Sequence, residues 1–161
     1  DLLAQAGAVA GVVQAVGLHA SLHLAQAQLV LGGDVLDGGI DLGIWLSCSH
    51  KVHDIAFVEY PEKGKLHHCS FLLESWEQVL RAGDIMSMNE VNVDIGPTRH
   101  GVTRGCTIYA WDPSGNRFET FMGGYQPYPD YEPFTWTFDN FGLGLDYPQR
   151  KLHETFLTVV T

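Results

Sequence analysis

The chain has 161 residues, 45% hydrophobic and 11% aromatic, so it is long enough to form one domain with a buried core. Its net charge of -10 and its nine scattered Lys and Arg residues exclude the basic surface typical of nucleic-acid-binding proteins. Three cysteines without a CxxC spacing argue against a disulfide framework and fit a reducing compartment, so we expect a cytoplasmic protein.

Residues 1–34 differ in character from the rest, because positions 2–33 contain no Asp, Glu, Lys or Arg. Interspersed Gln and His residues disfavour a membrane span, and the absence of early positive charge disfavours a signal peptide. We expect a strand over 8–15 and a helix over 17–30, where apolar residues recur at helical spacing. A truncated or wrongly read coding segment is the alternative interpretation of this stretch.

Residues 35–125 have ordinary charge and turn usage and form the main predicted domain. Ser75 and Gln78 form a capping-box pattern for a helix over 74–83, which Gly83 is expected to end. Strands are predicted over 40–46, 53–60, 66–73, 91–95, 106–111 and 117–122.

The order strand, helix and three strands appears after residue 65, and residues 8–60 can be read in the same order. Two such βαβββ units side by side predict an α+β fold with a cupped mixed sheet and a cleft. The aromatic-rich stretch 126–161 is expected to pack on this domain as a tail.

Two segments each place a metal-type ligand on a predicted strand. His67 and His68 are adjacent on the strand over 66–73, so their side chains are expected to point to opposite faces. Glu119 lies between Phe118 and Thr120, where an inward carboxylate is costly unless it is paired or bound to a metal. A histidine and a carboxylate are two thirds of a 2-His-1-carboxylate site for non-haem Fe(II). The alternatives are a hydrogen-bonded histidine and a solvent-facing Glu119.

Three more residues are candidates for chemistry. His53 starts a strand and has an ordinary pKa near neutrality, which suits a general acid or base. His100 lies in a loop where it would contact a substrate or face solvent. Tyr109 needs a partner for its hydroxyl if it is buried, and a substrate oxygen is one option.

From about residue 43 to the end, the chain resembles the C-terminal half of the type I extradiol ring-cleavage dioxygenases, the catechol 2,3-dioxygenase family. The resemblance rests on long strings: HDIAFVEYPEKGKLHHCSFLLESWEQVLRAGDIMSMN, VDIGPTRHGVTRG, TIYAWDPSGNRFETF and YPQRKLHETFLTVVT. It implies the paired-module fold of the vicinal oxygen chelate type, also called the glyoxalase, bleomycin resistance and dioxygenase type. It also implies Fe(II)-dependent cleavage of catechol by O2, beside its two hydroxyls, to 2-hydroxymuconic semialdehyde, in aromatic catabolism.

The resemblance also implies roles for the candidate residues. His68 and Glu119 match two of the three iron ligands, and His53 matches a histidine that handles protons and oxygen. His100 and Tyr109 match the residues that hydrogen-bond the catecholate. A catechol-type substrate, O2 and a homo-oligomeric state, a tetramer in the family, are implied, with no nucleic-acid or membrane partner.

Two departures from the family leave alternatives open. The family has a further N-terminal domain, and its first iron histidine would fall near residue 7 or 8, where this chain has Gly7 and Ala8. The alternative functions are a catalytically incomplete fragment of such an enzyme and a glyoxalase-like metal-dependent isomerase or lyase on the same fold.

Overall fold

The computed structural model describes residues 9–14, 43–46, 51–59, 64–126 and 144–157. These residues form seven strands, one α-helix and one 3-10 helix: β1 (Val9–Gln14), β2 (Gly43–Leu46), β3 (Ile55–Glu59), β4 (Leu66–Leu72), α2 (Trp76–Met88), β5 (Val93–Arg99), β6 (Gly105–Trp111), β7 (Arg117–Gly123) and η2 (Glu154–Leu157). The order β4, α2, β5, β6, β7 confirms the predicted strand, helix and three strands. The helix expected over 17–30 lies outside the described residues.

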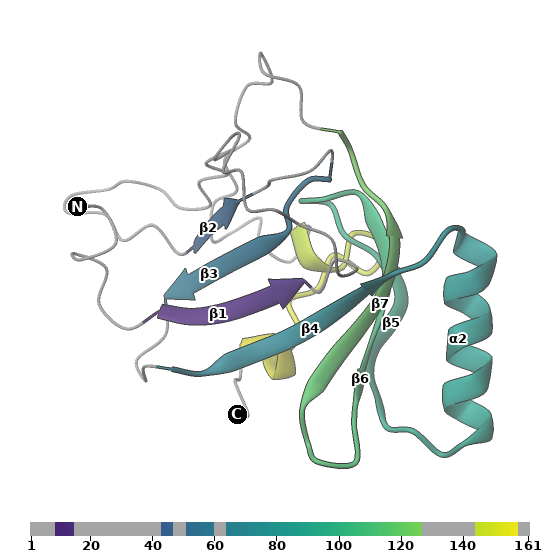
Figure 1. Cartoon of the computed structure of the whole chain (residues 1–161). Helices are drawn as coiled ribbons and strands as arrows, with labels where there is room; N and C mark the ends of the chain where they lie inside the picture. The colour runs from purple at the N-terminus through teal and green to yellow at the C-terminus, as the bar shows by residue number, and fades with distance from the viewer. Residues whose placement is uncertain (1–8, 15–42, 47–50, 60–63, 127–143, 158–161) are drawn as a thin grey trace, which may run out of the picture.

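All seven strands belong to one curved sheet in the order β2-β3-β1-β4-β7-β6-β5 (Figure 1). β4 lies at its centre and pairs in parallel with both β1 and β7, whereas the outer pairs are antiparallel. The mixed sheet and the single described α-helix confirm the predicted α+β class. Within the described ranges, no helix combines the length and apolarity needed to cross a bilayer.

Helix α2 covers one face of the β5, β6 and β7 strands. Val79 and Met86 of the helix pack with Ile108 and Ala110 of β6, and these four residues form the hydrophobic core cluster. The predicted N-cap is confirmed, because the Ser75 hydroxyl accepts a hydrogen bond from the backbone N–H of Gln78 at 3.3 Å. Burial of this helix fixes the β6 and β7 backbones and leaves their alternate side chains for the opposite face.

The prediction that Gly83 ends the helix is wrong, since α2 continues to Met88 and Asn89 is its C-cap. A Cβ at Gly83 would lie 2.9 Å from Cδ1 of Ile108. The glycine therefore allows close packing of helix on sheet instead of ending the helix. Met86, three residues beyond it, supplies the buried contact that favours the extra helical turn.

Strand β4 contains an irregularity at its two histidines. Along β1, Gly11 and Val13 are two positions apart, while their partners on β4, Leu66 and Cys69, are three positions apart. The extra residue on β4 is a bulge that interrupts the normal alternation of side chains. This bulge decides where His67 and His68 point.

Candidate active site

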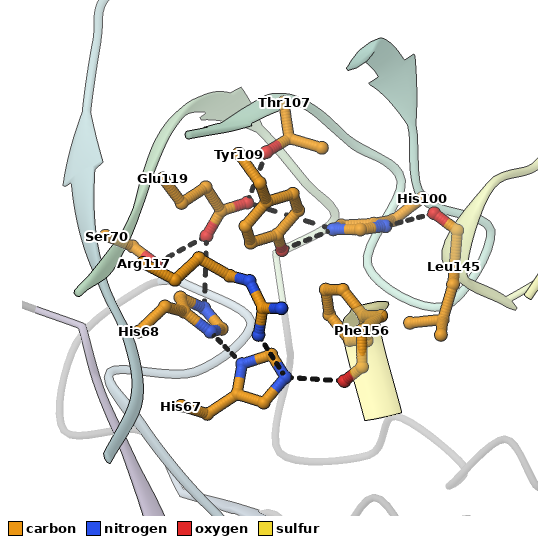
Figure 2. Close-up of polar contacts among 10 residues, drawn as sticks. All are labelled: His67, His68, Ser70, His100, Thr107, Tyr109, Arg117, Glu119, Leu145 and Phe156. Atoms are coloured by element: carbon orange, nitrogen blue, oxygen red, sulfur yellow. Dashed lines mark hydrogen bonds and ion pairs between the residues drawn. The ribbon is translucent and has the colours of Figure 1, made fainter. Parts of the chain in front are cut away.

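Glu119 is the centre of a buried polar cluster (Figure 2). Its partner Tyr109 alternates along β6 with Ile108 and Ala110, which pack on α2, so the cluster lies on the opposite face of the sheet. The Glu119 strand, β7, pairs with β4 and β6, and the residues directly opposite Glu119 are Ser70 and Tyr109. One carboxylate oxygen accepts a hydrogen bond from the Ser70 hydroxyl, and the other accepts one from the Thr107 hydroxyl at 2.5 Å. The burial predicted for Glu119 as one of two alternatives is thus confirmed, since only 6% of it is exposed.

Two histidines face the Glu119 carboxylate. His68 Nε2 lies 3.5 Å from Oε2, and His100 Nε2 lies 3.8 Å from Oε1. Burial by itself would raise the pKa of Glu119, but the interactions with His100 and His68 outweigh it and hold that pKa well below its usual value. Glu119 is therefore a carboxylate at neutral pH and carries the negative charge of the cluster.

The expectation that His67 and His68 point to opposite faces is wrong. Both side chains are buried, and their Nδ1 atoms are 2.5 Å apart (Figure 2). The physical reason is the bulge in β4, which adds a residue at this point and turns both rings to the same side. Burial, followed by the charge of His68, lowers the pKa of His67 to about 3, so His67 is neutral at physiological pH.

His100 and Tyr109 form a hydrogen-bonded pair beside Glu119. His100 Nε2 lies 2.8 Å from the Tyr109 hydroxyl, and His100 Nδ1 donates to the carbonyl of Leu145. His100 follows β5 in a loop, yet it is 7% exposed, so the structure excludes the solvent-facing alternative. Burial and the Glu119 charge raise the pKa of Tyr109 well above its usual value, which keeps the phenol protonated.

His53 precedes β3 and lies beside the same cluster. Burial lowers the pKa of His53 to about 4, while Glu119 opposes the shift and His68 and His100 add to it. The side chain is partly exposed, but its Nδ1 is buried and finds no hydrogen-bond partner among the described residues. A buried imidazole nitrogen without a described partner is available to a ligand or to a proton.

Several residues of the site were not predicted from the sequence. Arg117 is fully buried, donates from Nε to Asp94 Oδ2 at 3.0 Å and donates from Nη2 to the Thr155 carbonyl. The Phe156 ring makes edge contacts with His67 and Tyr109 at centroid distances of 4.7 and 5.2 Å. A usable signal existed for Arg117, because it lies two residues before Glu119 on one strand and must share its face. No sequence pattern indicates the contacts of Phe156.

The donor atoms of His68 and Glu119 suit a divalent transition metal. Imidazole nitrogen and carboxylate oxygen bind Fe, Mn and Zn, and donors about 2.1 Å from one ion can be separated by 3.5 Å, as these two are. Within the described parts of the chain, however, no group of three His, Cys, Asp or Glu residues could hold a metal ion. The expected position of the third ligand, near residue 7 or 8, lies outside the described residues. The described site thus fits two thirds of a ligand set.

Comparison with known proteins agrees with this arrangement. The Glyoxalase/Bleomycin resistance protein/Dioxygenase superfamily matches residues 28–120. The chain is 54% identical to metapyrocatechase from Pseudomonas sp. (strain CF600) over 125 residues, which are 78% of this chain and 41% of that protein. A manganese-dependent 2,3-dihydroxybiphenyl 1,2-dioxygenase from Geobacillus genomosp. 3 is 38% identical over 106 residues, which are 63% of this chain and 34% of that protein.

Solved structures give the same result. The 2,3-dioxygenase LapB from Pseudomonas sp. KL28 is 88% identical and has a TM-score of 0.65, covering 70% of this chain and 39% of that one. Homoprotocatechuate 2,3-dioxygenase from Brevibacterium fuscum, 23% identical with a TM-score of 0.68, covers 80% of this chain and 41% of its own and shows the shared fold. The chain spans less than half the length of each of these relatives. It belongs to the Glyoxalase/Bleomycin resistance protein/Dioxygenase superfamily and, within it, to the catechol 2,3-dioxygenase family.

Proposed function

We propose that this chain carries the catalytic half of an Fe(II)-dependent extradiol dioxygenase, which cleaves catechol with O2 to 2-hydroxymuconic semialdehyde. The observation that supports the proposal most directly is the buried cluster of His68, Glu119, His100 and Tyr109 on one face of the sheet. The sequence predicted all four residues as members of one site. They lie close together although His68 and Glu119 are 51 positions apart in the sequence.

In this proposal His68 and Glu119 hold the metal, with a third ligand from outside the described residues. A bound Fe(II) ion supplies open coordination positions for catechol and O2 and lowers the pKa of a catechol hydroxyl. Manganese is the competing metal, because one relative is named as manganese-dependent. Turnover of the chain after separate reconstitution with Fe(II) and with Mn(II) decides between the two.

The remaining side chains would act on the substrate directly. The protonated Tyr109 hydroxyl, 2.8 Å from His100 Nε2, can donate a hydrogen bond to a substrate oxygen that carries negative charge. The Leu145 carbonyl holds the proton on His100 Nδ1 and so orients the ring with Nε2 toward the Tyr109 hydroxyl.

His53 has the properties of the proton-handling group. With its pKa lowered to about 4 it is neutral at pH 7, and its unpartnered Nδ1 can accept a proton from the substrate and return it. The Phe156 ring contacts four aromatic or imidazole rings of the site at centroid distances of 4.7–6.4 Å and excludes water from that side.

The test begins with anaerobic reconstitution of the purified chain with Fe(II). Catechol and air are then added, and O2 uptake is recorded together with the yellow ring-cleavage product. We expect uptake and colour together, and we expect Glu119→Gln to lower turnover by more than about 100-fold, since even the loss of an outer-sphere partner of a metal ligand costs about 10–100-fold. Glu77→Gln, the same change on the exposed side of α2, is the matched control and keeps activity.

A second function is favoured by one observation of the sequence: Gly7 and Ala8 occupy the positions where the resemblance places the first iron histidine. In that case the chain is a catalytically incomplete member of the family. A folded chain that takes up neither metal nor O2 would contradict the dioxygenase proposal and support this one. Metal binding with isomerase or lyase turnover and no O2 uptake would instead support the glyoxalase-like alternative. The cytoplasmic location and the homo-oligomeric state stay predictions.

A further inference from the structure

A hydrogen-bonded chain leads from the C-terminal turn to the proposed metal ligand. The carbonyl oxygen of Phe156 lies 2.7 Å from His67 Nε2, and His67 Nδ1 lies 2.5 Å from His68 Nδ1 (Figure 2). At its other ring nitrogen, His68 faces Glu119 at 3.5 Å. None of the roles proposed above uses His67, although this residue is buried and contacts a metal ligand directly.

The Phe156 carbonyl fixes the position of one proton. A carbonyl oxygen accepts hydrogen bonds and cannot donate them, so the nitrogen 2.7 Å away must carry a proton. If His67 Nε2 were unprotonated, two sets of lone pairs would face each other at that distance. Arg117 Nη1 can only donate and also lies near this nitrogen, but at 3.1 Å it is farther away, so the shorter contact with the carbonyl decides where the proton is. We therefore place a proton on His67 Nε2.

The contact between the two Nδ1 atoms then requires a single proton between them. If that proton belonged to His67, its ring would carry two protons and a positive charge while largely buried and 3.1 Å from the Arg117 guanidinium. Two neighbouring buried cations are strongly unfavourable. The proton therefore belongs to His68 Nδ1, which donates to the unprotonated Nδ1 of a neutral His67.

We infer that His67 is a positioning residue that holds the proton of His68 on Nδ1 and thereby directs the Nε2 lone pair of His68 toward Glu119. Metal-binding imidazoles generally need such a partner on the second nitrogen, which fixes both the tautomer and the ring orientation. The partner is usually a carboxylate or a backbone carbonyl. Here a second imidazole takes that place, and the bulge in β4 makes the contact possible.

The C-terminal turn that contains η2 takes part in the same chain of contacts. Arg117 donates to the Thr155 carbonyl, next to the Phe156 carbonyl that accepts from His67, and Asp94 on β5 holds the guanidinium in place. The chain of contacts thus joins η2 to the β4 ligand strand. In the absence of His67, Glu119 is the acceptor nearest to the His68 ring, so the proton should move to Nε2 and block metal binding.

The tautomers of both rings can be measured directly in the full chain without metal. We would label the histidines with 15N and record long-range 1H–15N correlations at about pH 8, above the ordinary imidazole pKa of about 6.5. We expect a protonated Nδ1 on His68, and on His67 a protonated Nε2 with an unprotonated Nδ1. An unprotonated Nδ1 on His68, or a protonated Nδ1 on His67, would overturn the inference without any variant.

Two substitutions then separate positioning from general structural support. His67→Leu removes the acceptor and should move the His68 proton to Nε2, whereas His67→Asn keeps an oxygen near the Nδ1 position and should retain the proton on Nδ1. The His153 ring binds Asp146 at a distance of 2.8 Å and does not contact His67, although the His153 carbonyl accepts a hydrogen bond from the Phe156 N–H. Unchanged His153 signals in both variants should therefore show that the C-terminal turn keeps its fold. A protonated Nδ1 on His68 in a folded His67→Leu protein would overturn the positioning role.

The consequence for metal binding rests on the proposed function and is tested separately. Titration with Fe(II) under anaerobic conditions should give a Kd that is about 10–100-fold higher for His67→Leu than for the unchanged chain, with recovery in His67→Asn. Absence of metal binding by the unchanged chain would contradict the proposed function, while the tautomer measurement would still decide the role of His67. Equal affinities of the unchanged chain and the His67→Leu protein would overturn that role.

Discussion

Arg117 is the residue whose loss should damage the site most without removing a proposed ligand. Its guanidinium has no exposed surface, and Asp94, its ion-pair partner at 3.0 Å, keeps 4% of its side chain exposed. Arg117→Met would leave a buried carboxylate without its cation, which typically costs about 3–5 kcal/mol. It would also remove a donor to the Thr155 carbonyl and the stacking of Arg117 over Trp111, 4.3 Å from the ring centroid.

Urea unfolding at pH 7 measures this loss. We expect Arg117→Met to lower the free energy of unfolding by about 3–5 kcal/mol, and we expect Arg81→Met, on an exposed position of α2, to change it by less than about 0.5 kcal/mol. Adding Asp94→Asn to Arg117→Met should recover part of the loss, with a coupling of about 1–3 kcal/mol. A loss below about 1 kcal/mol, or strict additivity of the two substitutions, would refute the view that the ion pair is buried and coupled.

Three further results are expected. The pKa of His53 is about 4 in the folded chain and about 6.5 in the unfolded one, so the unfolded state binds more protons between these pH values. The free energy of unfolding in urea should therefore rise by about 3 kcal/mol from pH 4 to 6.5, and His53→Gln should flatten that rise. Gly96→Ala places a Cβ 2.6 Å from the Thr107 carbonyl at a φ of +104°, so it should lower the free energy of unfolding by about 2–4 kcal/mol. At Gly115 no atom lies within 4 Å of an added Cβ, so Gly115→Ala should lower it only by the backbone strain. Thr107→Val removes a donor to the buried Glu119 carboxylate and should lower the free energy of unfolding by about 1.5–3 kcal/mol; an unchanged urea midpoint would show that water replaces the hydroxyl.

The elements after residue 65 were predictable because their signals are local. The Ser75 cap and the β-rich runs over 106–111 and 117–122 depend on signals within a few residues, and the structure contains each of them. Side chains alternate along β7, so Glu119 lies on a buried face of the sheet. The sequence offered this as one alternative, in which the buried carboxylate must be paired or bound to a metal. The end of α2 was misjudged because a tertiary contact of Gly83 outweighs its poor helix propensity.

The features that were missed depend on contacts between distant segments. The direction of His67 follows from a bulge, which exists only because β1 pairs with β4 across more than fifty residues. His100 reads as an ordinary loop residue, and its burial depends on a hydrogen bond to Leu145, 45 positions away. Periodicity within one segment contains no information about such partners. The sequence could therefore predict candidate residues for the site but not the hydrogen bonds between them.

The choice of partners around Glu119 has a chemical consequence. Arg117 lies on the same strand face two residues away, and an arginine directed at this carboxylate would neutralise it and compete with any cation. Instead Arg117 is turned toward Asp94 and the C-terminal turn, and two neutral hydroxyls, from Ser70 and Thr107, orient the carboxylate. Neutral donors fix its geometry, and the imidazoles of His68 and His100 lie 3.5 and 3.8 Å from its oxygens. A buried carboxylate with this set of partners is arranged to attract a cation, which is the property that a metal ligand requires.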